Sequence, residues 1–115
     1  MENKPFVSII IPTTGHVKFI KGLVESVNKL DYPKKKYELI LIGDEETELL
    51  NDSSKKANDY GIKTVVKYEP FAAGKKRNIG VELANGDIIS FTDDDTFLRE
   101  DWINKSLLYT SDAAD

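Results

Sequence analysis

Three consecutive carboxylates, Asp93-Asp94-Asp95, follow the apolar run 88–92 and could together bind a divalent cation. Adjacent acids repel one another, and a bound cation offsets that repulsion. The run before them is rich in β-branched residues and predicts a buried strand. If the strand geometry continues, Asp93 and Asp95 project to the same side and converge on one ion, while Asp94 points away. The alternative is a solvated acidic turn that ends the strand.

Two further predicted strands end in polar segments, at residues 12–16 and 43–45. Ligands of open α/β sheets bind beyond the carboxyl ends of the strands, so these segments are the next candidates for a site. Asp44 could accept a hydrogen bond from a ribose hydroxyl or from the imide N–H of a base, because a carboxylate is an acceptor-only group. An aspartate that caps a turn or a helix is equally compatible with this position.

The residues after the first strand give weaker evidence for a binding role. Thr13 and Thr14 could contact a nucleobase or organise the loop, and the loop role is favoured for Thr14. His16, the one histidine, is interpreted as an exposed loop residue because no acid or nucleophile pattern accompanies it.

A basic cluster, Lys75-Lys76-Arg77, follows Gly74 where a helix is predicted to begin. Positive charge opposes the macrodipole at a helix N-terminus, and a diphosphate bound there by backbone N–H groups and Arg77 would reconcile the two. The alternative is a solvated basic patch. The segment is not a P-loop, because Glu69 stands where the first glycine of that motif belongs, and no G-x-G-x-x-G follows the first strand.

The elements that must position these residues alternate regularly. The sequence predicts strands at 6–11, 39–42, 64–68 and 88–92, and helices at 20–30, 46–60 and 75–84. The strands are short, nearly continuous apolar runs, as in buried parallel sheets. The order β-α-β-α-β-α-β therefore predicts an α/β fold with a mostly parallel open sheet and helices on both faces.

Length and composition fit one globular domain. The chain has 115 residues, of which 40% are hydrophobic and 31% charged, and its net charge of −4 argues against a nucleic-acid partner. The absence of cysteine excludes disulfides and thiolate chemistry. No signal peptide or membrane-spanning run is predicted, so a cytoplasmic location is expected.

Four segments in this order resemble family-2 glycosyltransferases of the GT-A fold. They are 7–13 (VSIIIPT), 37–44 (YELILIGD), 74–80 (GKKRNIG) and 84–95 (ANGDIISFTDDD), with Asp101-Trp102-Ile103 as a common continuation. The resemblance, over roughly residues 7–103, implies the Rossmann-like half of that fold, which binds a nucleotide-diphosphate sugar.

The resemblance also implies roles for individual residues. Pro12, Thr13 and Asp44 would lie at the base and ribose, and Arg77 at the diphosphate or base. Asp93 and Asp94 would contact the nucleotide sugar, with Asp93 at the ribose. Asp95 would hold Mn²⁺ or Mg²⁺.

The implied activity is inverting transfer of a sugar, most simply from a UDP-sugar, to a saccharide or other hydroxyl acceptor. Two positions depart from the family pattern: Gly43 stands where the first of two acids is common, and Lys76 stands where alanine is common. Lys76 either adds charge near the diphosphate or faces solvent.

The family's acceptor site and catalytic base come from a C-terminal half, expected beyond residue 115. Residues 1–106 are expected to form the nucleotide-sugar-binding half-domain of a truncated frame, inactive alone. Residues 107–115 resemble a translated adaptor sequence and are expected to be a non-native tail. Membrane association is expected only through regions beyond this chain.

Two other functions stay open. One is a nucleotide- or metal-binding module without turnover. The other is a phosphatase of the haloacid-dehalogenase type, which also places aspartates after a strand. That motif requires D-x-D-x-T after the first strand, whereas here Thr96 comes one residue early and the acids follow the fourth strand.

Overall fold

The computed structural model describes residues 4–13, 19–70, 73–94 and 96–107. Its elements, in chain order, are β1 (Val7–Pro12), α1 (Ile20–Asn28), the 3₁₀ helix η2 (Lys34–Lys36), β2 (Tyr37–Gly43), α2 (Glu48–Asp59), β3 (Lys63–Tyr68), α3 (Ala73–Leu83) and β4 (Ile88–Phe91). Residues 102–107 form a further helical turn.

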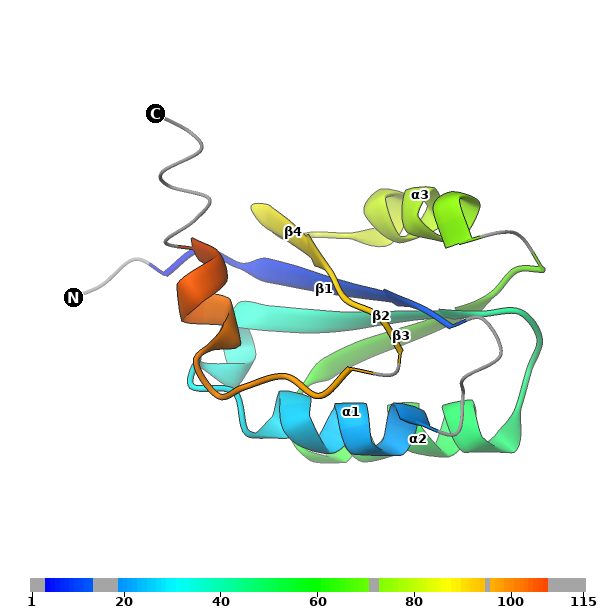
Figure 1. Ribbon diagram of the computed structural model, residues 1–115, viewed down its shortest axis with the longest axis horizontal. Coiled ribbons are helices and arrows are strands. Elements are labelled where there is room, and N and C mark those ends of the chain that lie inside the picture. The colour runs from blue at the N-terminus through cyan, green and yellow to red at the C-terminus, as the bar shows by residue number, and fades with distance from the viewer. Residues whose placement is uncertain (1–3, 14–18, 71–72, 95, 108–115) are drawn as a thin grey trace.

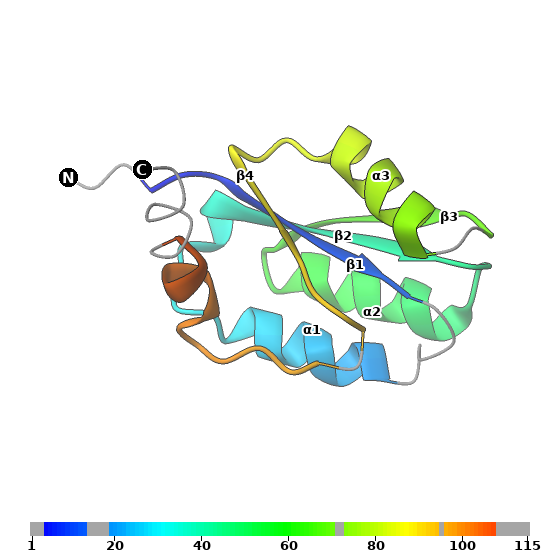
Figure 2. The same ribbon diagram turned by 45° about the horizontal axis from the view of Figure 1, so that its top comes forward.

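The four strands form one parallel sheet in the order β3-β2-β1-β4. Helices α1 and α2 cover one face and α3 covers the other (Figure 1 and Figure 2). The chain moves outward from β1 to β2 and β3, then crosses back to place β4 on the other side of β1. The predicted fold class, an open parallel sheet with helices on both faces, is confirmed.

Strands β1 and β2 are buried on both faces, as their continuous apolar runs predict. Alternate residues point to opposite faces of the sheet. On the side of α1 and α2, Ile9 and Leu39 join the larger core, while Ile10 and Ile40 join a smaller one with Ile79 of α3. The two central strands therefore anchor every helix that surrounds the carboxyl edge.

Strand β4 differs from the prediction. The run 88–92 was expected to be a buried strand, but Ile89 and Phe91 are 37% and 43% exposed, and the strand ends at Phe91. The reason is position: β4 is the edge strand of the described sheet, and α3 packs on β1 and β2. The face of β4 on the α3 side lies beyond the area that this helix covers.

Helix α3 begins at Ala73, two residues before the predicted start, so Gly74 lies in its first turn. Gly80 lets this helix approach the sheet closely. A Cβ atom at Gly80 would lie 2.5 Å from Cγ2 of Ile10 and 3.1 Å from Cδ1 of Ile42. Because the contacting atoms belong to packed core side chains, the close approach depends on glycine. It brings the residues one turn earlier, around Lys76, down to the end of β2.

After β4 the chain returns along α1. The backbone N–H of Leu98 donates to the Ser26 hydroxyl at 3.0 Å, and that of Asp31 donates to the carbonyl of Glu100 at 2.7 Å. Leu107, at the start of the predicted tail, is helical and packs against the core, and residues 108–115 lie outside the described part. None of the described helices is long and apolar enough to span a membrane.

Candidate functional site

The candidate site lies along the carboxyl edge of the sheet. Thr13 follows β1, Asp44 follows β2, and Asp93 and Asp94 follow β4. Because β1 lies between β2 and β4, the two acidic positions lie two strand spacings apart, about 10 Å. Strands β2 and β3 lie on one side of β1, and β4 lies on the other side, so the strand order reverses between β1 and β4. Open α/β sheets bind ligands at such a reversal.

Asp44 is held by a lysine from α3. The Lys76 ammonium donates a hydrogen bond to Oδ1 of Asp44 and forms an ion pair with it. The side chain of Lys76 is completely buried, whereas that of Asp44 is 49% exposed. Of the two alternatives for Lys76, exposure to solvent is therefore wrong, and its ammonium lies against Asp44 at the end of β2. Added charge near a diphosphate stays a prediction.

Thr13 and Pro12 form the wall between Asp44 and β4. Thr13 is 3% exposed, and its backbone N–H and hydroxyl both donate to the carbonyl of Ile42, at 2.8 and 3.3 Å. The hydroxyl therefore fixes the loop to β2, and Pro12 is buried at the end of β1. Thr14 and His16 lie outside the described residues.

Gly43 has a packing role at this edge. A Cβ atom there would lie 2.7 Å from Cδ2 of Leu50 and 3.2 Å from the Thr13 hydroxyl oxygen. Its carbonyl accepts a hydrogen bond of 2.8 Å from the backbone N–H of Glu69. Gly43 is thus required by close packing among β1, α2 and β3, and the carboxylate of Asp44 follows directly after it.

Asp93 and Asp94, which follow β4, do not continue the strand. Asp94 lies in a turn and is 4% exposed, while Asp93 is exposed. The backbone N–H of Thr96 donates to the carbonyl of Asp93 at 3.3 Å, which bends the chain there. The condition for Asp93 and Asp95 to share one side, a strand that continues past Thr92, is not met at Asp93 and Asp94, because β4 ends at Phe91 and the chain turns. Asp95, the predicted metal ligand, lies outside the described residues.

The three basic residues of the cluster on α3 differ in their exposure to solvent. Lys75 and Arg77 are exposed, and Lys76 is buried against the sheet. Arg77 lies in the helix's N-terminal half, which follows β3 and therefore stands at the carboxyl edge (Figure 2). Its predicted contact with a diphosphate stays a prediction.

Carboxylates suit a hard divalent cation, and Mg²⁺ in particular is often held by one or two of them together with substrate phosphates. Within the described ranges, no three metal-ligating side chains gather closely enough to hold an ion by themselves. Of the two described acids after β4, Asp93 is exposed and can meet a ligand, whereas Asp94 is 4% exposed. A separate hollow of about 500 Å³ lies between β4 and residues 99–106, away from Asp44 and Lys76.

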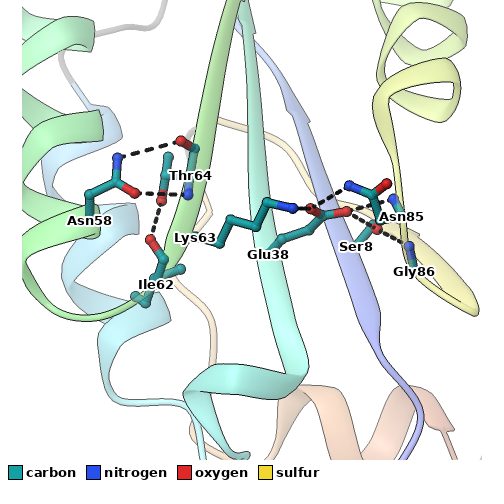
Figure 3. A network of polar contacts seen from close by, with 8 residues as sticks. All are labelled: Ser8, Glu38, Asn58, Ile62, Lys63, Thr64, Asn85 and Gly86. Carbon is teal, nitrogen blue, oxygen red and sulfur yellow. Dashed lines mark hydrogen bonds and ion pairs between the residues drawn. The ribbon is translucent and has the colours of Figure 1, made fainter.

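Sequence reasoning missed Glu38, which organises the opposite edge of the sheet (Figure 3). This side chain is completely buried. It accepts hydrogen bonds from the Ser8 hydroxyl at 2.6 Å and from the backbone N–H of Asn85 at 2.7 Å, and Lys63 lies 3.7 Å away. The available signal was a single carboxylate at the start of a wholly apolar strand.

Burial alone raises the pKa of Glu38, but the opposing contacts outweigh it. The hydrogen bonds from Ser8 and Asn85, with the nearby charge of Lys63, bring the pKa of this carboxyl below its usual 4.5. The Ser8 hydroxyl oxygen in turn accepts from the backbone N–H of Gly86 at 2.8 Å. The network joins β1 and β2 to the turn that leads into β4, and so fixes the direction from which β4 approaches the site.

An open α/β sheet with acids at the carboxyl ends of β2 and β4 has its polar groups at the edge where such sheets bind ligands. A sequence profile for Glycosyl transferase family 2 matches residues 8–114. The chain therefore belongs to glycosyl transferase family 2.

Curated relatives agree with this assignment. Over 103 residues the chain is 33% identical to the poly(ribitol-phosphate) beta-N-acetylglucosaminyltransferase TarS of Staphylococcus aureus, a match that covers 88% of this chain and 17% of TarS. It is 35% identical over 113 residues to an uncharacterized glycosyltransferase of Haemophilus influenzae, covering 91% of this chain and 42% of that protein. The chain thus spans less than half of either relative.

Solved structures show the same fold. The crystal structure of S. aureus TarS residues 1–349 matches with a TM-score of 0.80 at 24% identity, covering 93% of this chain and 32% of that one. TarS is also solved with UDP and with UDP-GlcNAc. The mannosyltransferase PcManGT of Pyrobaculum calidifontis, in complex with GDP-Man and Mn²⁺, matches with a TM-score of 0.78 at 21% identity, covering 91% and 32%.

Proposed function

We propose that this chain forms the nucleotide-sugar-binding part of an inverting glycosyltransferase that uses a UDP-sugar and a divalent cation, Mn²⁺ or Mg²⁺. The observation that carries the proposal is the placement of Asp44 at the end of β2 and of Asp93 and Asp94 after β4, on either side of β1. UDP is the favoured nucleotide because TarS, which is 33% identical to this chain over 103 residues, has been solved with UDP and with UDP-GlcNAc.

The nucleoside would lie at the end of β2. There Asp44 accepts a hydrogen bond from the base or ribose, and Pro12 and Thr13 form the neighbouring wall. Asp93 accepts from a ribose hydroxyl, with Asp94 beside it. This assignment uses carboxylates as acceptors, the one hydrogen-bonding role an ionised carboxyl has.

The diphosphate would lie between the end of β4 and the N-terminal half of α3. Asp95 holds the cation, and Arg77 contacts the diphosphate as a charge-assisted donor. When bound, the cation supplies compensating charge for a leaving diphosphate. Oxygen donors such as Asp95 and the phosphates match the preference of Mg²⁺ and Mn²⁺.

In the proposed reaction an acceptor hydroxyl attacks the anomeric carbon from the face opposite the leaving group. The new C–O bond forms as the bond to the nucleotide diphosphate breaks, the nucleotide takes the electron pair, and a base removes the hydroxyl proton. We assign no base or acceptor site among the described residues. The part described here binds and orients the donor, which is the contribution of positioning to catalysis.

A thermal melt of the 115-residue chain tests the proposal, with Mn²⁺ alone, UDP alone, and both. A ligand at about ten times its Kd adds roughly 1.4 kcal/mol, hence several degrees. We expect the full shift only with both ligands. Asp95→Ala should abolish the synergy, while Asp59→Asn, an exposed acid at the end of α2, should keep it. A melt unaffected by UDP with Mn²⁺ would contradict the proposed nucleotide site.

The second candidate is a nucleotide- and metal-binding module without turnover. It is favoured by the fact that the described residues supply donor-binding groups, with no base assigned among them. A UDP-release assay on a longer form of the protein that includes an acceptor-binding part separates the candidates: both predict the melting shift of the 115-residue chain, and only the first predicts released UDP in the longer form.

A further inference from the structure

Lys76 is a buried cation with one described counter-ion. Its side chain has no exposed surface, and its ammonium donates to Oδ1 of Asp44. An ammonium that has lost its water is costly unless a paired carboxylate and hydrogen bonds replace that water. The close approach of α3 at Gly80 holds Lys76 at this depth. Lys76 and Asp44, 32 positions apart, therefore act as one unit.

Only one member of the Lys76–Asp44 pair is exposed to solvent. Asp44 is 49% exposed and Lys76 is 0% exposed, so a ligand at the edge meets the carboxylate and not the ammonium. A carboxylate offers about four acceptor positions on two oxygens. The bond from Lys76 occupies Oδ1 and restrains rotation of the carboxyl group, which leaves Oδ2 as an acceptor for a ligand.

The local charge also differs from that of a site with two acids. Gly43 contributes packing only, and the charge of Asp44 is neutralised by Lys76. Lys76 thus pairs with the carboxylate of Asp44 while leaving its second oxygen as an oriented acceptor.

We propose that Lys76 is a positioning residue that determines base specificity: it holds Asp44 so that one carboxylate oxygen accepts the imide N–H of uracil. The inference rests on the proposed nucleotide-sugar function. Uracil presents an N–H donor at N3, whereas cytosine presents a lone pair there, which a fixed carboxylate repels. A carboxylate free to rotate would discriminate less, because it could turn away from the lone pair of cytosine.

The test measures the Kd of UDP and CDP, each with Mn²⁺, for the wild-type chain and for Lys76→Met. Methionine has a similar length and fills the buried space without a charge, and Asp44 keeps its access to water, so the fold is expected to persist. We expect the wild type to prefer UDP. In Lys76→Met the Kd of UDP should rise about tenfold or more, and that of CDP should change little.

Two controls isolate the role of Lys76. Lys75→Met removes a neighbouring, exposed charge on the same helix and should leave the ratio of the two Kd values unchanged, because it does not act through Asp44. In an Asp44→Asn background, adding Lys76→Met should cause no further loss of UDP affinity, because Lys76 acts through the carboxylate.

The outcomes separate the two proposals. If the wild type binds UDP but does not prefer it over CDP, or if Lys76→Met leaves UDP affinity unchanged or weakens both nucleotides equally, the role of Lys76 is refuted and the nucleotide site stands. If the wild type binds neither nucleotide with Mn²⁺, the proposed function fails and this inference fails with it.

Discussion

Each end of β2 has a carboxylate paired with a lysine, but the two ends differ in which partner is buried. At the amino end, Glu38 is completely buried and its lysine, Lys63, is 61% exposed. At the carboxyl end, Lys76 is completely buried and its acid, Asp44, is 49% exposed. The apolar residues of β2 separate the two pairs on the face that α3 covers.

The two carboxylates therefore differ in what they can contact: Glu38 is enclosed by the fold, and Asp44 is open to a ligand. The carboxylate at Glu38 is surrounded by donors from β1 and from the turn before β4, so nothing about it is offered to a ligand (Figure 3). At the other end the lysine is buried and the acid faces outward. A buried carboxylate with saturated hydrogen bonds stabilises the fold, and a half-exposed carboxylate restrained from behind is available for recognition.

The largest expected effect is the loss of the Glu38 network. Glu38→Ala leaves the buried Ser8 hydroxyl without its acceptor and removes the acceptor of the part-buried N–H of Asn85, and should lower the free energy of unfolding by about 2–4 kcal/mol. Denaturant titration measures the change. Lys63→Ala, the matched control, removes the exposed partner and should change stability by less than about 0.5 kcal/mol. Equal losses in the two variants would show that the ion pair, and not the hydrogen-bond network, carries the stability.

A smaller loss is expected at the other end. Asp44→Ala leaves the buried Lys76 ammonium without its described counter-ion and should cost about 2 kcal/mol, less than a fully buried pair because water reaches the vacated position. Adding Lys76→Met removes the stranded charge, so the double variant should regain most of the loss. The same denaturant titration checks the recovery. A double variant no more stable than Asp44→Ala would show that the two residues are not coupled.

The smallest effect is the pH dependence of stability. The pKa of Glu38 is lowered on folding, so its contribution is complete above the usual value of 4.5 and is lost as the pH falls through the lower folded value. The stability difference between wild type and Glu38→Gln should therefore shrink in acid. Urea titrations between neutral and acidic pH measure it. A difference that stays constant across that range would mean that Glu38 titrates alike in both states.

Local patterns predicted the secondary structure well. Helix α2, for example, begins after Thr47, whose hydroxyl oxygen accepts from the backbone N–H of Leu50 at 3.1 Å, and is followed by Gly61 at φ 93°. A capping hydroxyl and a glycine with positive φ are short-range signals that the sequence states directly. The prediction for β4 failed because its apolar residues indicate a strand and not the number of layers that cover it.

The sequence by itself determined the alternation of strands and helices, and hence which residues follow each strand, because hydrophobic period and capping are local. It therefore placed Asp44 and Asp93 at one edge. Only the tertiary structure decided that Lys76 is buried against Asp44, since that contact joins positions 32 apart and depends on the close approach of α3 at Gly80. The same holds for Glu38 and Asn85, 47 positions apart. Such pairings are set by how helices pack on the sheet, and a residue's type alone does not reveal which partner the packing will bring to it.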